Sequence, residues 1–258
     1  MSASGGAQAS DRAAARPAVK ICGIMQEETL RGMDGLPVDY IGFIFAPKSR
    51  RYVTPERAGA LIEVSRDSRM ADGGAPLAVG VFVDPTLEEL AAVLAAAPLD
   101  VVQLHGKRET PEFCREVGQR FKVEVWRALA ADGAEEAEGG ESSFASDADA
   151  GSAVQVDAPA GPVRLAAYAD AVSAVLIDTA GGGTGRAFPW EVIPAYERAA
   201  RAAGLRLFVA GGLDPDNVSE LLSAYAPDGV DISSGVETDG VKDASKIAAF
   251  AERVKKQS

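Results

Sequence analysis

The stretch Leu176-Ile177-Asp178-Thr179-Ala180, followed by the glycine-rich residues 181–185, shows the pattern that decides the fold. A short, continuous apolar run ends in a polar residue, and the residues after it allow a tight turn. Continuous aliphatic runs of this length are typical of strands buried on both faces, as in parallel sheets. The stretch therefore predicts a buried parallel strand that presents an aspartate at its carboxyl end.

Similar apolar runs recur on both sides of this stretch, and helical signals separate most of them. Thr54-Pro55 and Thr110-Pro111 each place an N-cap before a proline at the first helical position, and residues 86–89 form a capping box. Only a weak helix is expected at 163–169. The predicted strands are residues 19–22, 40–45, 77–83, 101–104, 123–128, 174–177, 207–210 and 230–233.

Regular alternation of about eight strands with helices indicates either a closed barrel or an open doubly wound sheet. Polar motifs follow the strands from the first to the last, whereas an open sheet would concentrate them at one switch point. In a barrel, all strand ends converge on one mouth. The length of 258 residues also suits one barrel of about 250 residues. We therefore predict an α/β fold, a single (β/α)8 TIM barrel, over residues 18–258.

Two segments fall outside the alternation. Residues 1–17 are rich in Ala, Ser and Gly and lack a long apolar run, so they predict a disordered tail with neither a signal peptide nor a membrane span. Residues 131–162 are acidic and hold almost no large apolar side chains, so they cannot bury enough surface to order themselves. We expect a flexible acidic loop insertion there, with an acidic docking segment as the alternative.

The composition limits the partners and the compartment. A net charge of −12 argues against nucleic acid, because binding to the phosphate backbone requires clustered Lys and Arg. The two cysteines, Cys22 and Cys114, form no disulfide framework, which suits the cytoplasm. The only histidine, His105, argues against a His-rich metal site. With Gln103 it is expected to form a polar wall of the mouth.

The ends of the first two strands carry chemically informative residues. Cys22 ends the first strand before Gly23, which favours a reactive thiol over the usual packed cysteine. The basic loop within residues 42–53 contains Lys48, Arg50 and Arg51 and suggests an anionic substrate, with a solvated loop as the alternative.

The last two strand ends carry small residues, in the segments Gly211-Gly212 and Ser233-Ser234-Gly235. Barrel enzymes commonly bind phosphate at this position through backbone N–H groups. The partner predicted from these motifs is a small phosphorylated molecule.

Together these motifs resemble the phosphoribosylanthranilate isomerase family. The resemblance implies an Amadori rearrangement of N-(5-phosphoribosyl)anthranilate to its aminoketose in tryptophan biosynthesis, without metal or organic cofactor, in a monomer or homodimer. It implies Cys22 as general base and Asp178 as general acid, and Arg51 as a ligand of the anthranilate carboxylate. Gln103, His105, Gly183 and the two small-residue loops are assigned to substrate binding. The matching segments are residues 20–23, 42–53, 79–84, 102–106, 176–190, 211–218 and 231–237.

Two alternatives stay open. The histidine-pathway aminoaldose isomerase runs the same type of reaction with two aspartates, and Cys22 at the first strand end speaks against it. A non-catalytic phosphate-binding barrel would keep the loops at Gly211 and Ser233 but would not need both Cys22 and Asp178.

The proposed acid–base pair requires a shift in both side-chain pKa values. A free thiol has a pKa of ~8.5 and a free aspartic acid one of ~3.9, so the site must bring these values closer together. We expect Lys20 to be a poor source of these shifts, since alternation along the strand points it away from the neighbours of Ile21. Basic loop residues and the burial of Asp178 are therefore the expected causes of the shifts.

Overall fold

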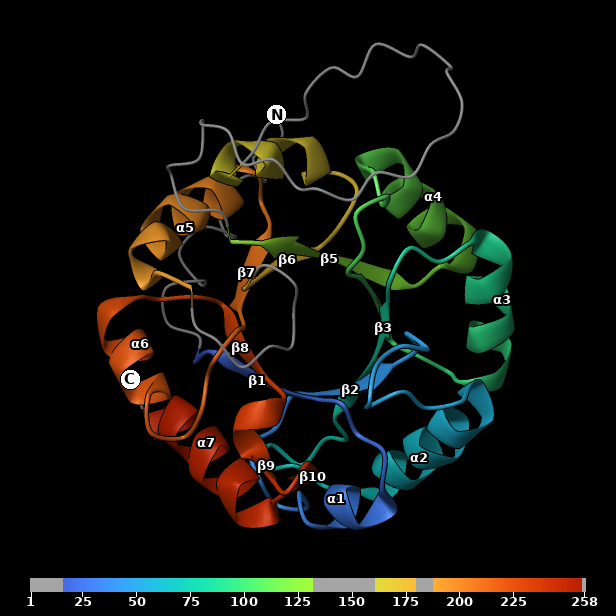
Figure 1. The fold of residues 1–258 in the computed structure, drawn as a ribbon, viewed down its shortest axis with the longest axis vertical. Coiled ribbons are helices and arrows are strands. Elements are labelled where there is room, and N and C mark those ends of the chain that lie inside the picture. The colour runs from blue at the N-terminus through green and yellow to red at the C-terminus, as the bar shows by residue number, and fades with distance from the viewer. Residues whose placement is uncertain (1–15, 132–160, 180–187, 257–258) are drawn as a thin grey trace, which may run out of the picture.

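The computed structural model describes residues 16–131, 161–179 and 188–256. Eight parallel strands pair in chain order and close into a barrel, because β1 pairs with β8 as well as with β2. The helices surround the barrel (Figure 1). The predicted (β/α)8 barrel is thus confirmed. The strands are β1 (Ala18–Cys22), β2 (Tyr40–Ile44), β3 (Leu77–Phe82), β4 (Val101–Leu104), β5 (Glu124–Ala130), β6 (Ala174–Asp178), β7 (Arg206–Val209) and β8 (Gly229–Ile232).

The helices between the strands begin largely where the sequence signals predict. Thr54, Thr86 and Thr110 each accept a backbone N–H of the first turn, and Thr86 forms a complete capping box with Glu89. The helices are α1 (Glu27–Arg31), α2 (Pro55–Asp67), α3 (Leu87–Ala96), α4 (Pro111–Phe121), α5 (Ile193–Ala202), α6 (Val218–Ala224) and α7 (Ala244–Lys256).

The crossover between β5 and β6 differs from the others in its described part. It holds a 3-10 helix, η1 (Gly161–Tyr168), in place of the weak α-helix predicted at 163–169. Leu165 and Tyr168 bury their side chains against the barrel and keep this short element in place. Most of the predicted acidic loop and of the N-terminal tail lies outside the described residues, so both remain predictions.

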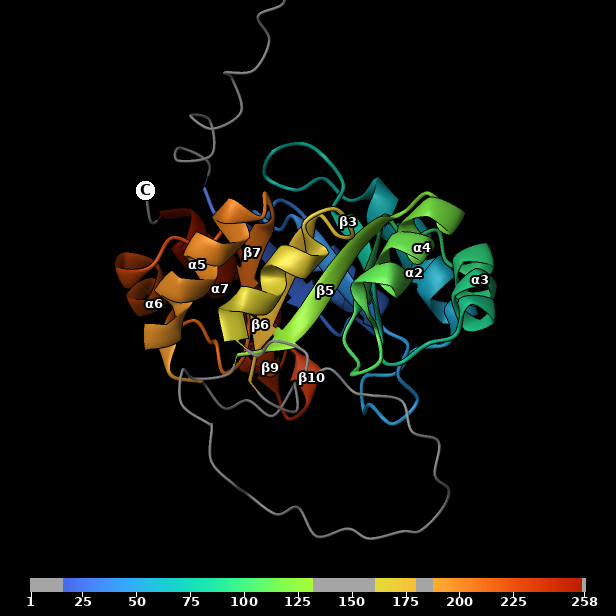
Figure 2. The same ribbon diagram turned by 90° about the horizontal axis from the view of Figure 1, so that it is seen from above.

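The carboxyl ends of the strands share one side of the barrel. After β8 the chain forms a 3-10 turn, η3 (Ser234–Val236), and an antiparallel hairpin of β9 (Glu237–Thr238) and β10 (Val241–Lys242). A further short 3-10 turn, η2 (Trp190–Val192), precedes α5. In Figure 2 the β5 arrow points toward the side on which this hairpin lies. No helix in the described ranges is both long and apolar enough to cross a bilayer.

The side chains that face the barrel interior divide it into an apolar floor and a polar mouth. Near the floor, Trp126 lies 4.5 Å from Phe208 and 4.8 Å from Tyr40, measured between ring centroids. Because side chains alternate along a strand, the inward positions follow at intervals of two residues. The apolar floor residues are therefore succeeded by polar ones nearer the mouth: Lys20 and Cys22 in β1, Gln103 in β4, Asp178 in β6 and Asp231 in β8.

The floor leaves no room for an added methyl group at Gly229. This residue pairs with Phe208 in the sheet, and a Cβ atom built on it would lie 2.4 Å from the Phe208 ring. We expect Gly229→Ala to lower the free energy of unfolding by about 1–3 kcal/mol, as overpacking does. Gly118→Ala is the control, because its Cβ in α4 would meet ordinary contacts at 3.5 Å.

The control should instead raise the free energy of unfolding by roughly 0.5–1 kcal/mol, since alanine restricts the unfolded chain at a helical position. Urea unfolding of both variants measures the two effects. Equal stability of Gly229→Ala and the parent protein would refute a rigid floor.

Candidate active site

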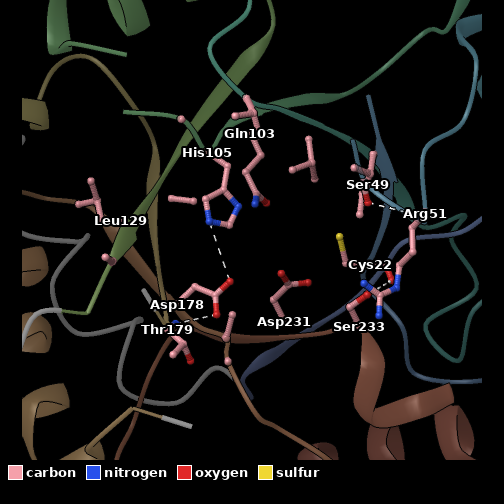
Figure 3. Close-up of a pocket in the computed structure, with 18 of the residues that line it drawn as sticks. Cys22, Ser49, Arg51, Gln103, His105, Leu129, Asp178, Thr179, Asp231 and Ser233 are labelled. Carbon is pink, nitrogen blue, oxygen red and sulfur yellow. Dashed lines mark hydrogen bonds and ion pairs between the residues drawn. The ribbon is translucent and has the colours of Figure 1, made fainter. Parts of the chain in front are cut away.

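The site residues predicted from the sequence converge on one cavity at the carboxyl ends of the strands. This cavity has a volume of about 990 Å³ and appears in Figure 3. Gly235 lies one residue beyond the lining residue Ser234, and Gly183 is outside the described residues. The predicted residues that line the cavity are Cys22, Arg51, Gln103, His105, Asp178, Gly211, Gly212, Ser233 and Ser234.

Cys22 ends β1 opposite Gly42 of β2. A Cβ atom on Gly42 would lie 2.8 Å from the Cys22 sulfur, so the glycine provides the space that the thiol occupies. Burial is the largest influence on this thiol and raises its pKa above the ordinary value. Lys20 and Lys242 act in the opposite direction and Asp231 adds to the rise, because nearby cations favour a thiolate and nearby anions disfavour it.

The expectation that Lys20 is a poor source of the pKa shift was wrong. Lys20 and Cys22 are two residues apart in one strand, so both side chains face the barrel interior. Lys20 is fully buried, and its Nζ donates a hydrogen bond of 2.8 Å to Oδ1 of Asp231. Lys20 is therefore the strongest electrostatic influence that favours the thiolate of Cys22.

Asp178 faces His105 across the cavity. Oδ1 of Asp178 accepts the backbone N–H of Thr179 at 2.7 Å, and Oδ2 lies 3.9 Å from Nε2 of His105, as the dashed lines in Figure 3 mark. Burial, together with the nearby charges of Arg127 and Lys20, lowers the pKa of His105 to about 4 despite the opposing charge of Asp231. The imidazole is consequently neutral near pH 7, and it lines the cavity.

Arg127 supports the wall that carries His105, a role that the sequence did not reveal. Its guanidinium group reaches from β5 and donates hydrogen bonds to the carbonyl oxygens of Leu104 at 2.9 Å and Gly106 at 2.6 Å. These two carbonyls flank His105 in the chain. A buried arginine in a strand carries no local signal for this contact, because β4 supplies its partners.

A second cluster surrounds the carboxylate of Glu237. Arg51 donates to it through Nε at 2.6 Å and Nη2 at 3.1 Å, while Lys242 lies 3.1 Å away and Arg50 also pairs with it. One carboxylate thus pairs with three cationic side chains, and two of these, Arg50 and Arg51, line the cavity of a protein whose net charge is −12. Gly23 allows this packing, since a Cβ there would lie 2.5 Å from Cδ of Arg51.

Neither Glu237 nor Lys242 was among the site residues predicted from the sequence. Glu237 closes the motif that begins at Asp231, so its position was visible, but its arginine partners lie 186 and 187 residues away along the chain. Only the closure of the barrel brings them together.

The loops after β7 and β8 present backbone to the cavity. Gly211 and Gly212 adopt φ values of +83° and +66°, which favour glycine. A Cβ on Gly211 would lie 2.5 Å from Oγ1 of Thr179, and one on Gly235 would lie 2.0 Å from the carbonyl oxygen of Leu213. Both loops therefore need glycine in order to pack against each other and against β6. Among the described residues, no cluster of His, Cys, Asp or Glu is arranged to hold a metal ion.

The Glu237 cluster predicts a pH-dependent contribution to stability. Burial opposes ionisation, but hydrogen bonds and charges from Arg51, Lys242 and Arg50 outweigh it and hold the pKa of Glu237 at about 2. An unfolded glutamate titrates near ~4.3, so this contribution is complete above that pH and is lost as the pH falls toward about 2.

We therefore expect Glu237→Gln to cost more free energy of unfolding at about pH 7 than at about pH 3. Denaturant titrations at both pH values measure the difference. Glu63→Gln, at an exposed position of α2, is the control and should change stability little at either pH. A cost that is the same at both pH values would contradict an ionised Glu237.

Comparisons with known proteins agree with this geometry. Residues 19–161 and 133–253 match the model of the family described as N-(5'phosphoribosyl)anthranilate (PRA) isomerase. The chain is 47% identical to the N-(5'-phosphoribosyl)anthranilate isomerase of Brevibacillus brevis over 237 residues, which covers 92% of this chain and 93% of the relative. It is 36% identical to that of Geobacillus thermodenitrificans, with the same coverage of both chains.

The chain is also similar to solved structures of phosphoribosyl anthranilate isomerases. The phosphoribosyl anthranilate isomerase of Thermus thermophilus is 33% identical, with a TM-score of 0.67, and the match covers 93% of this chain and 100% of that one. A phosphoribosyl anthranilate isomerase in complex with reduced 1-(o-carboxyphenylamino)-1-deoxyribulose 5-phosphate is 29% identical, with a TM-score of 0.66, covering 93% of this chain and 99% of the other. The family model matches most of the barrel and the relatives match over nearly their full length; this chain therefore belongs to the N-(5'-phosphoribosyl)anthranilate isomerase family.

Proposed function

We propose that this protein catalyses the Amadori rearrangement of N-(5-phosphoribosyl)anthranilate to 1-(2-carboxyphenylamino)-1-deoxyribulose 5-phosphate in tryptophan biosynthesis. The observation that carries the proposal is the arrangement of Cys22 and Asp178. One ends β1, the other ends β6, and both line a cavity with a cationic wall and two glycine-containing loops. Family membership supports the same activity.

The chemistry needs one acid and one base on a sugar phosphate. In the first step, Asp178 donates a proton to the furanose ring oxygen, and the C1–O bond breaks as the anilino nitrogen supplies its electron pair. The product is a protonated Schiff base. In the second step, the Cys22 thiolate removes the proton from C2, and the C–H electron pair forms the C1–C2 double bond of an enolamine.

The enolamine then tautomerises to the ketone. Its hydroxyl group at C2 loses a proton while C1 gains one, so the overall reaction is an isomerisation with no net oxidation or reduction. The two catalytic groups come from strands on different sides of the mouth, as Figure 3 illustrates, which suits proton transfers at separate atoms of one sugar.

Other residues of the site suit the carboxylate, the phosphate and the ribose of this substrate. Arg51, already oriented by Glu237, is the proposed ligand of the anthranilate carboxylate. Backbone N–H groups of the loops at Gly211-Gly212 and Ser234-Gly235 are the proposed phosphate ligands. Oε1 of Gln103 is buried and makes no hydrogen bond within the described protein, so it can accept one from a ribose hydroxyl.

The test is a fluorescence assay with freshly prepared phosphoribosylanthranilate, in which turnover consumes the fluorescent substrate. Binding of a product analogue without turnover would favour the non-catalytic phosphate-binding barrel. Turnover of the histidine-pathway aminoaldose alone would favour the other isomerase, although Cys22 at the end of β1 argues against it. A cytoplasmic location and a monomeric or homodimeric state stay predictions.

The catalytic pair gives a direct prediction. Cys22→Ser or Asp178→Asn should each reduce kcat by ~10²–10⁴-fold, the usual contribution of a positioned acid or base. Affinity for a product analogue should change much less, because neither group is proposed to hold the phosphate or the carboxylate. Cys114→Ser is the matched control, since that thiol is buried in α4 and does not line the cavity.

Steady-state kinetics and titration with the analogue distinguish the two effects. Near-normal turnover in Cys22→Ser would show that Cys22 is a packed thiol and not the base.

The phosphate loop gives a second prediction. Gly212→Val should raise KM, because valine is strained at φ +66° and its side chain keeps the phosphate away from the backbone. Gly204→Val is the control: Gly204 has a φ of +70° and precedes β7 at the opposite end of the strand. A loss of stability is expected in both variants, but a rise in KM only in Gly212→Val. Equal KM values in the two variants would refute backbone binding of phosphate at this loop.

A further inference from the structure

The proposed mechanism requires a thiolate at Cys22, yet burial raises the pKa of that thiol. We propose that Lys20 and Asp231 form a positioning pair that controls the ionisation of Cys22: the Lys20 ammonium group, fixed by Asp231, stabilises the thiolate in its buried position. This inference rests on the proposed function, because it assigns the pair a role in preparing the catalytic base.

The geometry of the barrel seam creates the pair. Lys20 of β1 and Asp231 of β8 are register partners, and their side chains form a buried ion pair of 2.8 Å between Nζ and Oδ1. Cys22 follows Lys20 by two residues on the same inward face of β1. The charge of the Lys20 ammonium group also acts on the Cys22 side chain and favours its thiolate. One cation therefore acts on both a carboxylate and a thiol.

The ammonium group remains charged despite its burial. Desolvation alone would lower the pKa of Lys20, but the charges of Asp231 and Cys22 and the hydrogen bond to Asp231 outweigh it and raise the pKa above the ordinary value. A buried charge is costly unless partners compensate it, and both Asp231 and the thiolate of Cys22 compensate the Lys20 ammonium group.

The two members of the pair influence the thiol with opposite sign. The cation of Lys20 lowers the pKa of Cys22, and the carboxylate of Asp231 raises it. Asp231 also lines the cavity, and Figure 3 draws it between Cys22 and Asp178. If Lys20 and Asp231 only filled space in the barrel, neutralising one and then the other would not shift the pKa of Cys22 in opposite directions.

Other cationic groups near the thiol are paired with a different carboxylate, that of Glu237. Lys242 of β10 also lowers the pKa of Cys22, more weakly than Lys20, and it is engaged by Glu237 and by the carbonyl oxygen of Ser233. Arg51 is held by the same glutamate.

The remaining surroundings of the thiol add little charge. Gly42, its neighbour in β2, contributes none. His105 and Asp178 belong to the far wall of the cavity, from β4 and β6. Lys20 is thus the cation with the largest effect on the thiol, and Asp231 is the anion with the largest effect.

The test measures thiol reactivity directly. In a Cys114→Ser background Cys22 is the single thiol, and its rate of alkylation by iodoacetamide is followed against pH. Burial is the largest influence on the Cys114 thiol and raises its pKa to about 12. Cys114 does not line the cavity, so Cys114→Ser removes the second thiol and leaves the cavity lining unchanged.

Lys20→Met should move the alkylation midpoint up, and Asp231→Asn should move it down, each by about 1 pH unit or more. Lys20→Arg, which keeps the charge, should restore most of the parent midpoint. The acid limb of the kcat profile with phosphoribosylanthranilate should move in the same direction as the thiol midpoint in each variant.

Lys255→Met is the matched control. Lys255 forms an ion pair with Asp39 at 2.8 Å, far from the cavity lining, so its loss should leave the thiol midpoint unchanged. If Lys20→Met does not fold, Asp231→Asn and Lys20→Arg still test the sign of the shift and the need for charge.

The outcomes separate this inference from the proposed function. Midpoints that do not move in the Lys20 and Asp231 variants overturn the pair, even if the parent protein turns over phosphoribosylanthranilate. Opposite shifts of the midpoint together with a parent protein that lacks turnover would overturn the proposed function and the catalytic purpose of the pair, while its electrostatic control of the thiol would stand.

Discussion

The pairing of β1 with β8 is the interaction on which the rest of the structure depends. It closes the sheet, and it brings Lys20 and Asp231 together although they are 211 residues apart in the chain. It also sets Ser233 against the end of β1, where its hydroxyl donates to the carbonyl oxygen of Cys22 at 3.0 Å. In an open sheet these groups would lie at opposite edges, and neither the ion pair nor the cavity would exist.

Closure of the barrel also lets polar side chains line the mouth, because an apolar cluster fills the interior beneath them. The inward positions nearest the amino ends hold an aromatic cluster around Trp126, Phe208 and Tyr40, and these rings exclude water from the floor. Polar groups then occupy the last inward positions before the mouth. Each is satisfied by a specific partner or faces the cavity, which limits the cost of burying charge inside the barrel.

The positive charge suited to an anionic substrate is local to the cavity, whereas the protein as a whole is negatively charged. A protein of net charge −12 would repel a phosphorylated, carboxylated substrate from most of its surface. Arg50 and Arg51 line the cavity and, together with Lys242, gather around Glu237, while glycine-containing loops line another part of it. The glutamate prevents the three cations from dispersing, so the substrate would meet a positive wall of fixed geometry.

The sequence by itself determined the strands, the capped helices, the barrel and the placement of Cys22 and Asp178 at strand ends, because these follow from local periodicity and local capping chemistry. It could not reveal which distant charges meet. Strand alternation alone places Lys20 on the same face as Cys22, so its orientation was misjudged from a local pattern. Its ion pair with Asp231 and the contacts of Glu237 and Arg127 were overlooked because the partners come from other strands or from loops far along the chain. The tertiary structure alone decided these contacts, since they depend on the register between strands and on closure of the barrel, neither of which any single segment encodes.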